Sequence, residues 1–234
     1  MSETLIQAQA PTQGLRLDLD GAQLFPGAVS GPGLTGLKNA LADQPSDHAG
    51  IRLFGLEALR PFLAPGGPIG SIAAQLMAGS PRPVRAILFD KTARANWSLG
   101  WHQDRVIAVK QRIEAKGFGP WTRKHGALHV APPFEVLEPM VTLRVHLDPV
   151  PATNAPLLIA PGSHRLGRIA EADVPAVVER SGTAICLAEP GDIWGYATPI
   201  LHASARAEDT AHRRVLQVDY AVADLPGGLE WLGV

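Results

Sequence analysis

His102 and Asp104 are the first residues in the chain whose types and spacing could do chemistry. They stand in the segment Trp101-His102-Gln103-Asp104. In a strand, residues two apart project from the same face, so one imidazole and one carboxylate could meet at a common point. A His-x-Asp pair also occurs on ordinary surfaces and in cores. A metal site therefore needs a third ligand from elsewhere in the chain.

A third ligand is available near the far end of the sequence, where Gly191 and Asp192 lead through Pro199 to His202. Two histidines and one carboxylate on one face of an octahedral metal are diagnostic of non-haem Fe(II) oxygenases. The sequence has a single cysteine, which disfavours a closed, thiolate-rich zinc site. These residue types favour an iron site with open coordination positions.

Three stretches resemble the phytanoyl-CoA dioxygenase-like family of Fe(II)/2-oxoglutarate-dependent dioxygenases. They are residues 101–104, 160–167 and 191–213, and their order and spacing match the family over about residues 84–221. The resemblance implies a double-stranded β-helix, or jelly roll, that uses Fe(II), 2-oxoglutarate as cosubstrate and O2. It also implies that His102, Asp104 and His202 bind the iron.

The resemblance also assigns residues to the cosubstrate. Arg213, eleven positions after His202, stands where the family places the arginine that holds the distal carboxylate of 2-oxoglutarate. A guanidinium suits this role because its planar fork grips a carboxylate bidentately and keeps its charge. Arg214 is the alternative, since strand alternation allows only one of the two side chains to point inward. Ser204, on the same face as His202, resembles the hydroxyl that assists this carboxylate.

Other polar residues could contact cosubstrate or substrate. Thr142, Arg144 and His146 alternate along one predicted strand, whose other, apolar face we expect to pack between two sheets. A buried Arg144 requires an anionic partner, either the proximal carboxylate of 2-oxoglutarate or an acid on the substrate. Better-known family members have an aromatic residue at this position, so Arg144 is a departure. The remaining candidates for the pocket wall are Lys91, Asn96, Trp97 and His129.

Several chemically capable residues have structural interpretations instead. Gly162 and His164 lie in a turn motif of the family, where Gly162 would supply unusual backbone angles. Asp192 follows a glycine before a strand and is interpreted as a turn residue. Cys186 lies in an apolar run and is expected to be inert. We predict no separate protein acid or base, because metal and cosubstrate carry the hard chemistry.

The elements that must position these residues are mostly strands, separated by Pro, Gly, Asn and Asp turns. Helical spacing predicts helices over residues 34–42 and 69–77, and period-2 alternation predicts a strand over residues 15–25. This pattern indicates a mainly β fold, an antiparallel double sheet buttressed by N-terminal helices, in agreement with the implied jelly roll. Further strands are predicted over residues 84–89, 105–109, 140–147, 157–160, 183–187, 193–196 and 215–222.

Length and charge limit the alternatives. The 234 residues suffice for one domain with a large core, and we predict a flexible lead-in over residues 1–14 and a single dioxygenase domain over residues 15–234. The 21 Lys and Arg nearly balance the 22 Asp and Glu, and no basic stripe points to nucleic acid or membrane partners. No stretch has the pattern of a leader or a membrane span, so a cytoplasmic protein is expected. The sequence does not define the oligomeric state.

The predicted function is an oxygenase, most simply a hydroxylase of an unactivated carbon in a small-molecule substrate, releasing succinate and CO2. Asp104 disfavours halogenation, because related halogenases have a small residue there. An insertion over residues 110–139 is rich in basic and aromatic residues, which suits an anionic substrate, and segments this long often cover active sites.

Two other functions are considered. If the protein were a non-catalytic jelly-roll protein that binds a metal or ligand, its sequence should lack a metal-ligand residue or the cosubstrate arginine. A cupin-like metalloenzyme that does not use 2-oxoglutarate predicts three or four histidines in closely spaced motifs. The sequence has neither pattern.

Overall fold

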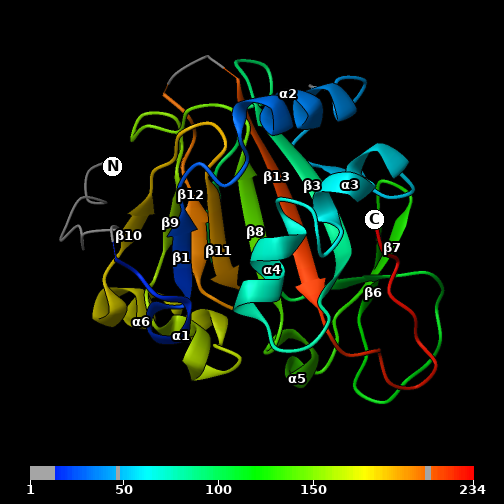
Figure 1. The fold of residues 1–234 in the computed structure, drawn as a ribbon. Coiled ribbons are helices and arrows are strands. Elements are labelled where there is room, and N and C mark those ends of the chain that lie inside the picture. Colours follow the sequence, from blue (N-terminus) through cyan, green and yellow to red (C-terminus); the bar gives the residue numbers. More distant parts are fainter. Residues whose placement is uncertain (1–13, 46–47, 209–211) are drawn as a thin grey trace.

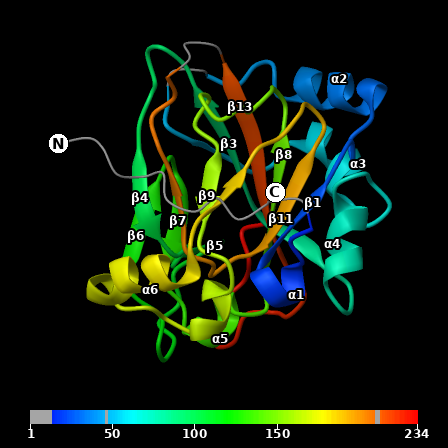
Figure 2. The ribbon, with the colours of Figure 1, turned by 90° about the vertical axis from the view of Figure 1, so that its left-hand side faces the viewer.

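The computed structural model describes residues 14–45, 48–208 and 212–234, and the predicted lead-in lies outside these residues except for Gly14. Two antiparallel sheets face each other (Figures 1 and 2). The large sheet has the order β1 (Ala22–Phe25), β11 (Ile193–Ala197), β8 (Val141–His146), β13 (Arg213–Ala221), β3 (Arg82–Lys91) and β2 (Ile51–Leu53). The second sheet has the order β10 (Ala184–Cys186), β9 (Leu157–Ile159), β12 (His202–Ser204) and β4 (Leu99–His102).

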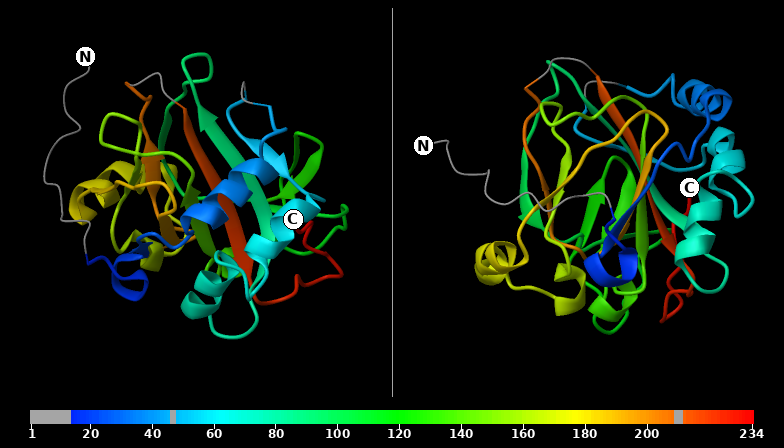
Figure 3. Two further views of the ribbon diagram at one scale, coloured as in Figure 1. Left: turned by 45° about the horizontal axis from the view of Figure 1, so that its top comes forward. Right: turned by 60° about the vertical axis from the view of Figure 1, so that its left-hand side comes forward.

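Helices cover the outer face of the large sheet. These are α2 (Gly31–Ala40), α3 (Arg60–Leu63) and α4 (Gly70–Leu76). The short 3-10 helix η1 (Glu57–Leu59) leads directly into α3. The left view of Figure 3 shows α2 lying across β13 and β3. The helices predicted over residues 34–42 and 69–77 correspond to α2 and α4, with ends shifted by one to three residues.

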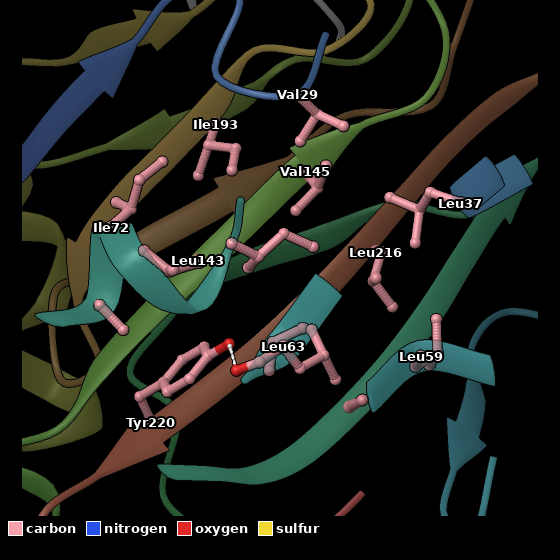
Figure 4. Packing of buried hydrophobic residues seen from close by; sticks show 14 of the residues in the cluster. Val29, Leu37, Leu59, Leu63, Ile72, Leu143, Val145, Ile193, Leu216 and Tyr220 are labelled. Atoms are coloured by element: carbon pink, nitrogen blue, oxygen red, sulfur yellow. Dashed lines mark hydrogen bonds between the residues drawn. The ribbon is translucent and has the colours of Figure 1, made fainter. Parts of the chain in front are cut away.

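The main apolar core lies between these helices and the large sheet (Figure 4). Leu143 and Val145 of β8 and Leu216 of β13 belong to this core. The Tyr220 hydroxyl donates a hydrogen bond of 3.1 Å to the backbone oxygen of Leu63 in α3. The expectation that the apolar face of β8 packs between two sheets is therefore wrong, because that face packs against helices. The opposite, polar face of the strand lies between the sheets.

The space between the sheets is apolar at one end. Trp194 and Tyr196 of β11 pack there against Leu157 and Ile159 of β9 and against Cys186 of β10. Burial raises the pKa of the Cys186 thiol to about 12, in keeping with an inert residue. Further helices are α1 (Leu17–Asp20), η2 (Ser163–Leu166), η3 (Glu171–Asp173) and α6 (Val174–Ser181).

The predicted insertion contains most of a small third sheet. The sheet has the order β5 (Ile107–Val109), β7 (Ala127–Val130) and β6 (Trp121–Lys124), and α5 (Phe134–Leu137) follows it. Ile107 and Val130 share an apolar cluster with Leu225 and Leu229 of the C-terminal segment, which runs beside this sheet in Figure 1. The insertion is therefore a packed element rather than a free loop.

The strand predicted over residues 15–25 is wrong in its first half, which forms α1 instead. The carboxylate of Asp20 accepts a hydrogen bond of 2.9 Å from the backbone N–H of Arg16. Gly21 then ends the turn with φ of 81°, and a Cβ there would lie 2.3 Å from the ring of His164. Only the residues after this glycine pair with β11. In the described ranges, no helix is long and apolar enough to cross a membrane.

Candidate metal centre

The three predicted ligands come together between β4 and β12. His102 ends β4 and His202 begins β12, and the two residues are paired across the antiparallel strands. Their ring centroids are 4.3 Å apart. Asp104 lies just beyond β4, so the explanation that it shares a strand with His102 is wrong. The ligating atoms of the three side chains nevertheless lie within 4.8 Å of one another.

Hydrogen bonds orient both imidazoles. Nδ1 of His102 lies 2.7 Å from the backbone oxygen of Gly100, and Nδ1 of His202 lies 2.9 Å from that of Ile200. A carbonyl oxygen only accepts, so Nδ1 carries the proton in each ring and Nε2 keeps its lone pair. Burial, with repulsion from His102, lowers the pKa of His202 to about 4. At neutral pH His202 is therefore a neutral ligand.

Arg85 of β3 and Gln217 of β13 fix the Asp104 carboxylate. Nη2 of Arg85 and Nε2 of Gln217 donate to Oδ2 of Asp104 at 3.1 and 3.4 Å. Arg85 is also ion-paired with Asp219, which accepts a hydrogen bond of 3.0 Å from Thr142. Burial raises the pKa of Asp104, but the positive charge of Arg85, joined by the two histidines when they are protonated at acid pH, outweighs it and holds that pKa below its usual value. Both bonds end on Oδ2, which leaves Oδ1 to turn to a metal.

This donor set fits a divalent iron ion. Two imidazole nitrogens and one ionised carboxylate oxygen suit Fe(II), and three protein ligands leave coordination positions open. Within the described ranges, no other group of three His, Cys, Asp or Glu side chains is close enough to share an ion.

His102, Asp104 and His202 all line a cavity of about 360 Å³ between the sheets. A larger hollow of about 790 Å³ beside α6 reaches His102 but neither Asp104 nor His202. The smaller cavity is therefore the one that can bring a ligand to the metal centre.

The cavity also holds a buried cluster of cations. Nη2 of Arg213 donates to the backbone oxygen of Ala155 at 2.8 Å and to the Ser204 hydroxyl at 3.2 Å. Nζ of Lys91 donates to the same hydroxyl at 3.0 Å. Nη1 of Arg144 donates to Gln217 at 3.0 Å. In the described part of the chain, no carboxylate lies within ion-pair distance of these three cations.

Burial and mutual repulsion define the electrostatics of this cluster. Burial, then the charge of Arg144, lower the pKa of Arg213 to about 9. Burial, then Arg213 and Arg144, lower the pKa of Lys91 to about 7. Nε of Arg144 and of Arg213 are buried without a partner. Buried cations without anions are costly, so this part of the cavity fits a bound anion.

Strand alternation separates Arg213 from Arg214. Arg213 is buried and lines the cavity. Nε and Nη2 of Arg214 donate to the two carboxylate oxygens of Asp148 at 2.9 and 2.8 Å. Only Arg213 is therefore placed to meet a ligand inside the cavity.

Of the other residues predicted for the pocket wall, some line the cavity and others do not. Trp97 lines the cavity, and its ring centroid lies 5.2 Å from Nζ of Lys91. Asn96 does not line it, because its amide bonds to the backbone of Ala207 in both directions, at 2.8 and 2.9 Å. His146 is buried and neither ring nitrogen has a partner, and burial lowers its pKa well below the usual value. His129 is buried behind the wall, and burial lowers its pKa to about 4.

The residues interpreted as structural have structural contacts. Gly162 adopts φ of 77° at the start of η2. The His164 ring packs against Gly21 so closely that a Cβ at this position would collide with it. The two carboxylate oxygens of Asp192 accept backbone hydrogen bonds from Gly27 at 2.7 Å and Glu189 at 2.8 Å.

Sequence reasoning missed Arg85, Gln217 and Asp219, which hold Asp104, and Arg52, which lines the cavity. Lys124, which also lines it, belongs to the insertion whose basic residues indicate an anionic substrate. Part of the signal is present in the sequence. Arg85, Gln217 and Asp219 interrupt otherwise apolar strands at positions that project to one face. Polar residues on the inward face of a predicted strand indicate a polar cavity rather than a core.

The fold and site place the chain in a known class of protein. Residues 70–215 match the family model described as phytanoyl-CoA dioxygenase (PhyH). The chain belongs to this family. No curated protein matches the chain.

Solved structures share the fold. The non-heme alpha ketoglutarate dependent epimerase SnoN from nogalamycin biosynthesis is 18% identical, with a TM-score of 0.64 over 91% of this chain and 88% of that one. EctD from S. alaskensis with 2-oxoglutarate and 5-hydroxyectoine is 17% identical, with a TM-score of 0.65 over 93% and 77%. AviO1 from Streptomyces viridochromogenes Tue57 is 17% identical, with a TM-score of 0.60 over 91% and 93%. These likenesses confirm the predicted jelly-roll class, in which the sheets do not close into a barrel.

Proposed function

We propose that this protein is an Fe(II)/2-oxoglutarate-dependent oxygenase that hydroxylates an unactivated carbon of a small metabolite. The observation that carries the proposal is that the three ligand side chains share one cavity with the buried, unpaired Arg213. Family membership supports it, as do structures described as SnoN with Fe3+ and alpha ketoglutarate and EctD with 2-oxoglutarate.

His102, Asp104 and His202 would hold the iron through Nε2, a carboxylate oxygen and Nε2. Bound iron, with 2-oxoglutarate and O2, supplies the oxidation of carbon and the release of succinate and CO2. The protein's own contribution is orientation. The carbonyls of Gly100 and Ile200 keep each imidazole in the ligand tautomer, and Arg85 holds Asp104 ionised.

Arg213 would hold the distal carboxylate of 2-oxoglutarate, and the Ser204 hydroxyl, already bonded to Arg213 and Lys91, would assist it. Arg144 shares Gln217 with Asp104, which places it next to the metal ligands. It would meet the proximal carboxylate of 2-oxoglutarate or an acid on the substrate. Among the residues that the structure describes, Asp104 is the only carboxylate that lines the cavity, and we propose no separate protein acid or base.

The test is titration of the anaerobic Fe(II) protein with 2-oxoglutarate, followed by the visible charge-transfer absorption of the iron chelate. Arg213→Ala should weaken binding far more than Arg214→Ala, because only Arg213 faces the cavity. Loss of a buried charged pair costs on the order of 2–5 kcal/mol, a drop of tens- to thousands-fold in affinity. Absence of binding by the unaltered protein, or a larger loss in Arg214→Ala, would contradict the proposal.

A further inference from the structure

We propose that Arg52 and Lys124 form an anion-binding subsite for the substrate, so that the substrate is a small molecule carrying a phosphate ester or a carboxylate. The inference rests on the function proposed above and deepens it, because it names the class of substrate and the residues that select it. Neither residue belongs to the metal centre or to the Arg213 site.

Arg52 lines the cavity and has no anionic partner among the described residues. It lies on β2 opposite Ile87 of β3, and both residues line the cavity. Nη1 of Arg52 donates to the backbone oxygen of Gly50 at 2.9 Å and to Nδ1 of His125 at 3.3 Å. Nε is buried without a partner. Burial and repulsion from Arg85 lower the pKa of Arg52 while Asp104 opposes them, which places Arg52 within electrostatic range of the metal ligands.

Lys124 reaches the same cavity from the small sheet. It is the last residue of β6, and the turn that follows has positive φ at His125 (47°) and Gly126 (79°). A positive φ is uncommon outside glycine, although histidine tolerates it better than most residues. Here the turn presents the His125 ring to Arg52. The hydrogen bond between His125 and Arg52 connects the β6–β7 hairpin to β2. Lys124 and Arg52 therefore line the same cavity.

The charges of the cavity exceed what the cosubstrate can neutralise. Arg85 is paired with Asp219 and Asp104, and Arg105 with Glu171. The cations that line the cavity without an ion-pair partner in the described ranges are Arg52, Lys91, Lys124, Arg144 and Arg213. One carboxylate of 2-oxoglutarate would meet the metal and Arg144, which shares Gln217 with Asp104. The other carboxylate would meet Arg213, with Lys91 bonded to the same Ser204 hydroxyl. Arg52 and Lys124 then remain for the substrate.

The rest of the wall suits the carbon part of such a substrate. Ile87, Phe89, Trp97 and Leu99 line the same cavity. An apolar body with an anionic group at one end would match both parts of the surface, because the half-buried Arg52 has a buried Nε without a partner and the exposed Lys124 adds a second positive charge.

The experiment compares phenyl phosphate, benzoate and phenol, which share a ring and differ in charge. Each is titrated calorimetrically into the anaerobic Fe(II) protein saturated with 2-oxoglutarate. We expect phenyl phosphate or benzoate to bind at least tenfold more tightly than phenol, and the tighter of the two anions identifies a phosphate ester or a carboxylate as the natural group. Equal affinity for all three compounds would overturn the proposal.

Three variants locate the anion. Arg52→Gln and Lys124→Gln should each weaken anion binding by about ten- to a hundredfold, the cost of a lost charged hydrogen bond, and should leave 2-oxoglutarate affinity unchanged. Arg123→Gln is the matched control, because Arg123 is the neighbouring residue on β6, bonds to the backbone of Gly126 and does not line the cavity.

An equal loss in Arg123→Gln would overturn the subsite, as would displacement of 2-oxoglutarate by phenyl phosphate. Failure of 2-oxoglutarate itself to bind would contradict the proposed function. Titration of phenyl phosphate without 2-oxoglutarate, into the same variants, would then still decide for or against Arg52 and Lys124.

Discussion

Two neighbouring arginines on β13, Arg213 and Arg214, differ in the direction of their side chains and therefore in whether their charge is neutralised. Arg214 is neutralised by a bidentate pair with Asp148, whereas Arg213 bonds to a carbonyl and a hydroxyl that cannot neutralise it. The same side-chain chemistry therefore makes an ion pair within the fold at one position and leaves an unneutralised charge at the next, where we propose that a carboxylate binds. Strand alternation predicts that the two differ, and family spacing predicts which one faces inward.

Because of Lys91, we expect the affinity for 2-oxoglutarate to depend on pH. Its pKa is lowered to about 7 by burial and by Arg213 and Arg144. A bound carboxylate favours the charged ammonium and raises this pKa, so binding above pH 7 must be accompanied by proton uptake. Affinity for 2-oxoglutarate should be highest below pH 7 and fall as the pH rises above it, by at most about tenfold per pH unit.

The measurement is the Kd for 2-oxoglutarate of the anaerobic Fe(II) protein on both sides of this pKa. Calorimetry in buffers of different ionisation enthalpy should show the proton uptake directly. In Lys91→Met both the slope and the uptake should disappear. If the variant keeps the slope of the unaltered protein, another group is responsible.

At the scale of elements, the long strands and the short strands β5, β9 and β10 were predictable from sequence, whereas β4 and β12, which carry the two histidines, were not. β3, β8 and β13 have six to ten residues, most of them apolar or β-branched. β4 and β12 have four and three residues and no period-2 pattern, because the strands they pair with and the site they carry determine their sequence. His102 and His202 could thus be identified by type, but their pairing across β4 and β12 requires the fold.

The two faces of β13 should respond differently to substitution. Leu216 has no exposed surface and packs in the core under the helices, whereas its neighbour Gln217 lines the cavity. Leu216→Ala should lower the free energy of unfolding by about 2–5 kcal/mol, measured by urea titration. Its affinity for 2-oxoglutarate should be unchanged at a temperature where it remains folded. A weakened affinity would mean that the helix layer also shapes the site.

The cross-strand pair of Arg85 and Asp219 should set metal affinity. The two residues are directly opposite on β3 and β13, and Arg85 orients Asp104. Removing both charges in Arg85→Met/Asp219→Asn avoids leaving one buried charge alone. Outer residues that orient a metal ligand typically contribute 10- to 100-fold, so Mn(II) affinity should fall by about that factor.

Arg82→Met is the control for this pair. Arg82 also lies on β3, but its ion pair is with the exposed Asp224. Its loss should leave Mn(II) affinity unchanged. Equal effects of the two variants, measured by electron paramagnetic resonance of free Mn(II), would assign the loss to general destabilisation.

For the whole molecule, the space between the sheets has two different characters. Its apolar end around Trp194 and Tyr196 holds the layers together, and its cationic end around Lys91, Arg144 and Arg213 is the cosubstrate site that we propose. Repulsion among these cations opposes folding, and the core between the large sheet and the helices must compensate. Binding sites that need buried charge commonly reduce stability in this way.

This division predicts that removing Lys91 stabilises the ligand-free protein and reduces its stabilisation by ligand. Lys91→Met replaces a buried charge beside Arg213 with an apolar side chain of similar length, so the free energy of unfolding should rise by about 1 kcal/mol. For the unaltered protein, Mn(II) with 2-oxoglutarate at a hundred times its Kd should add about 2.7 kcal/mol, which is about 5–10 °C in Tm at this chain length. The variant should gain much less at the same ligand concentration, because its affinity is lower. Thermal unfolding with and without ligand checks both parts, and a lower Tm for ligand-free Lys91→Met would mean that the bonds from Lys91 to Ser204 and Ala205 outweigh the repulsion.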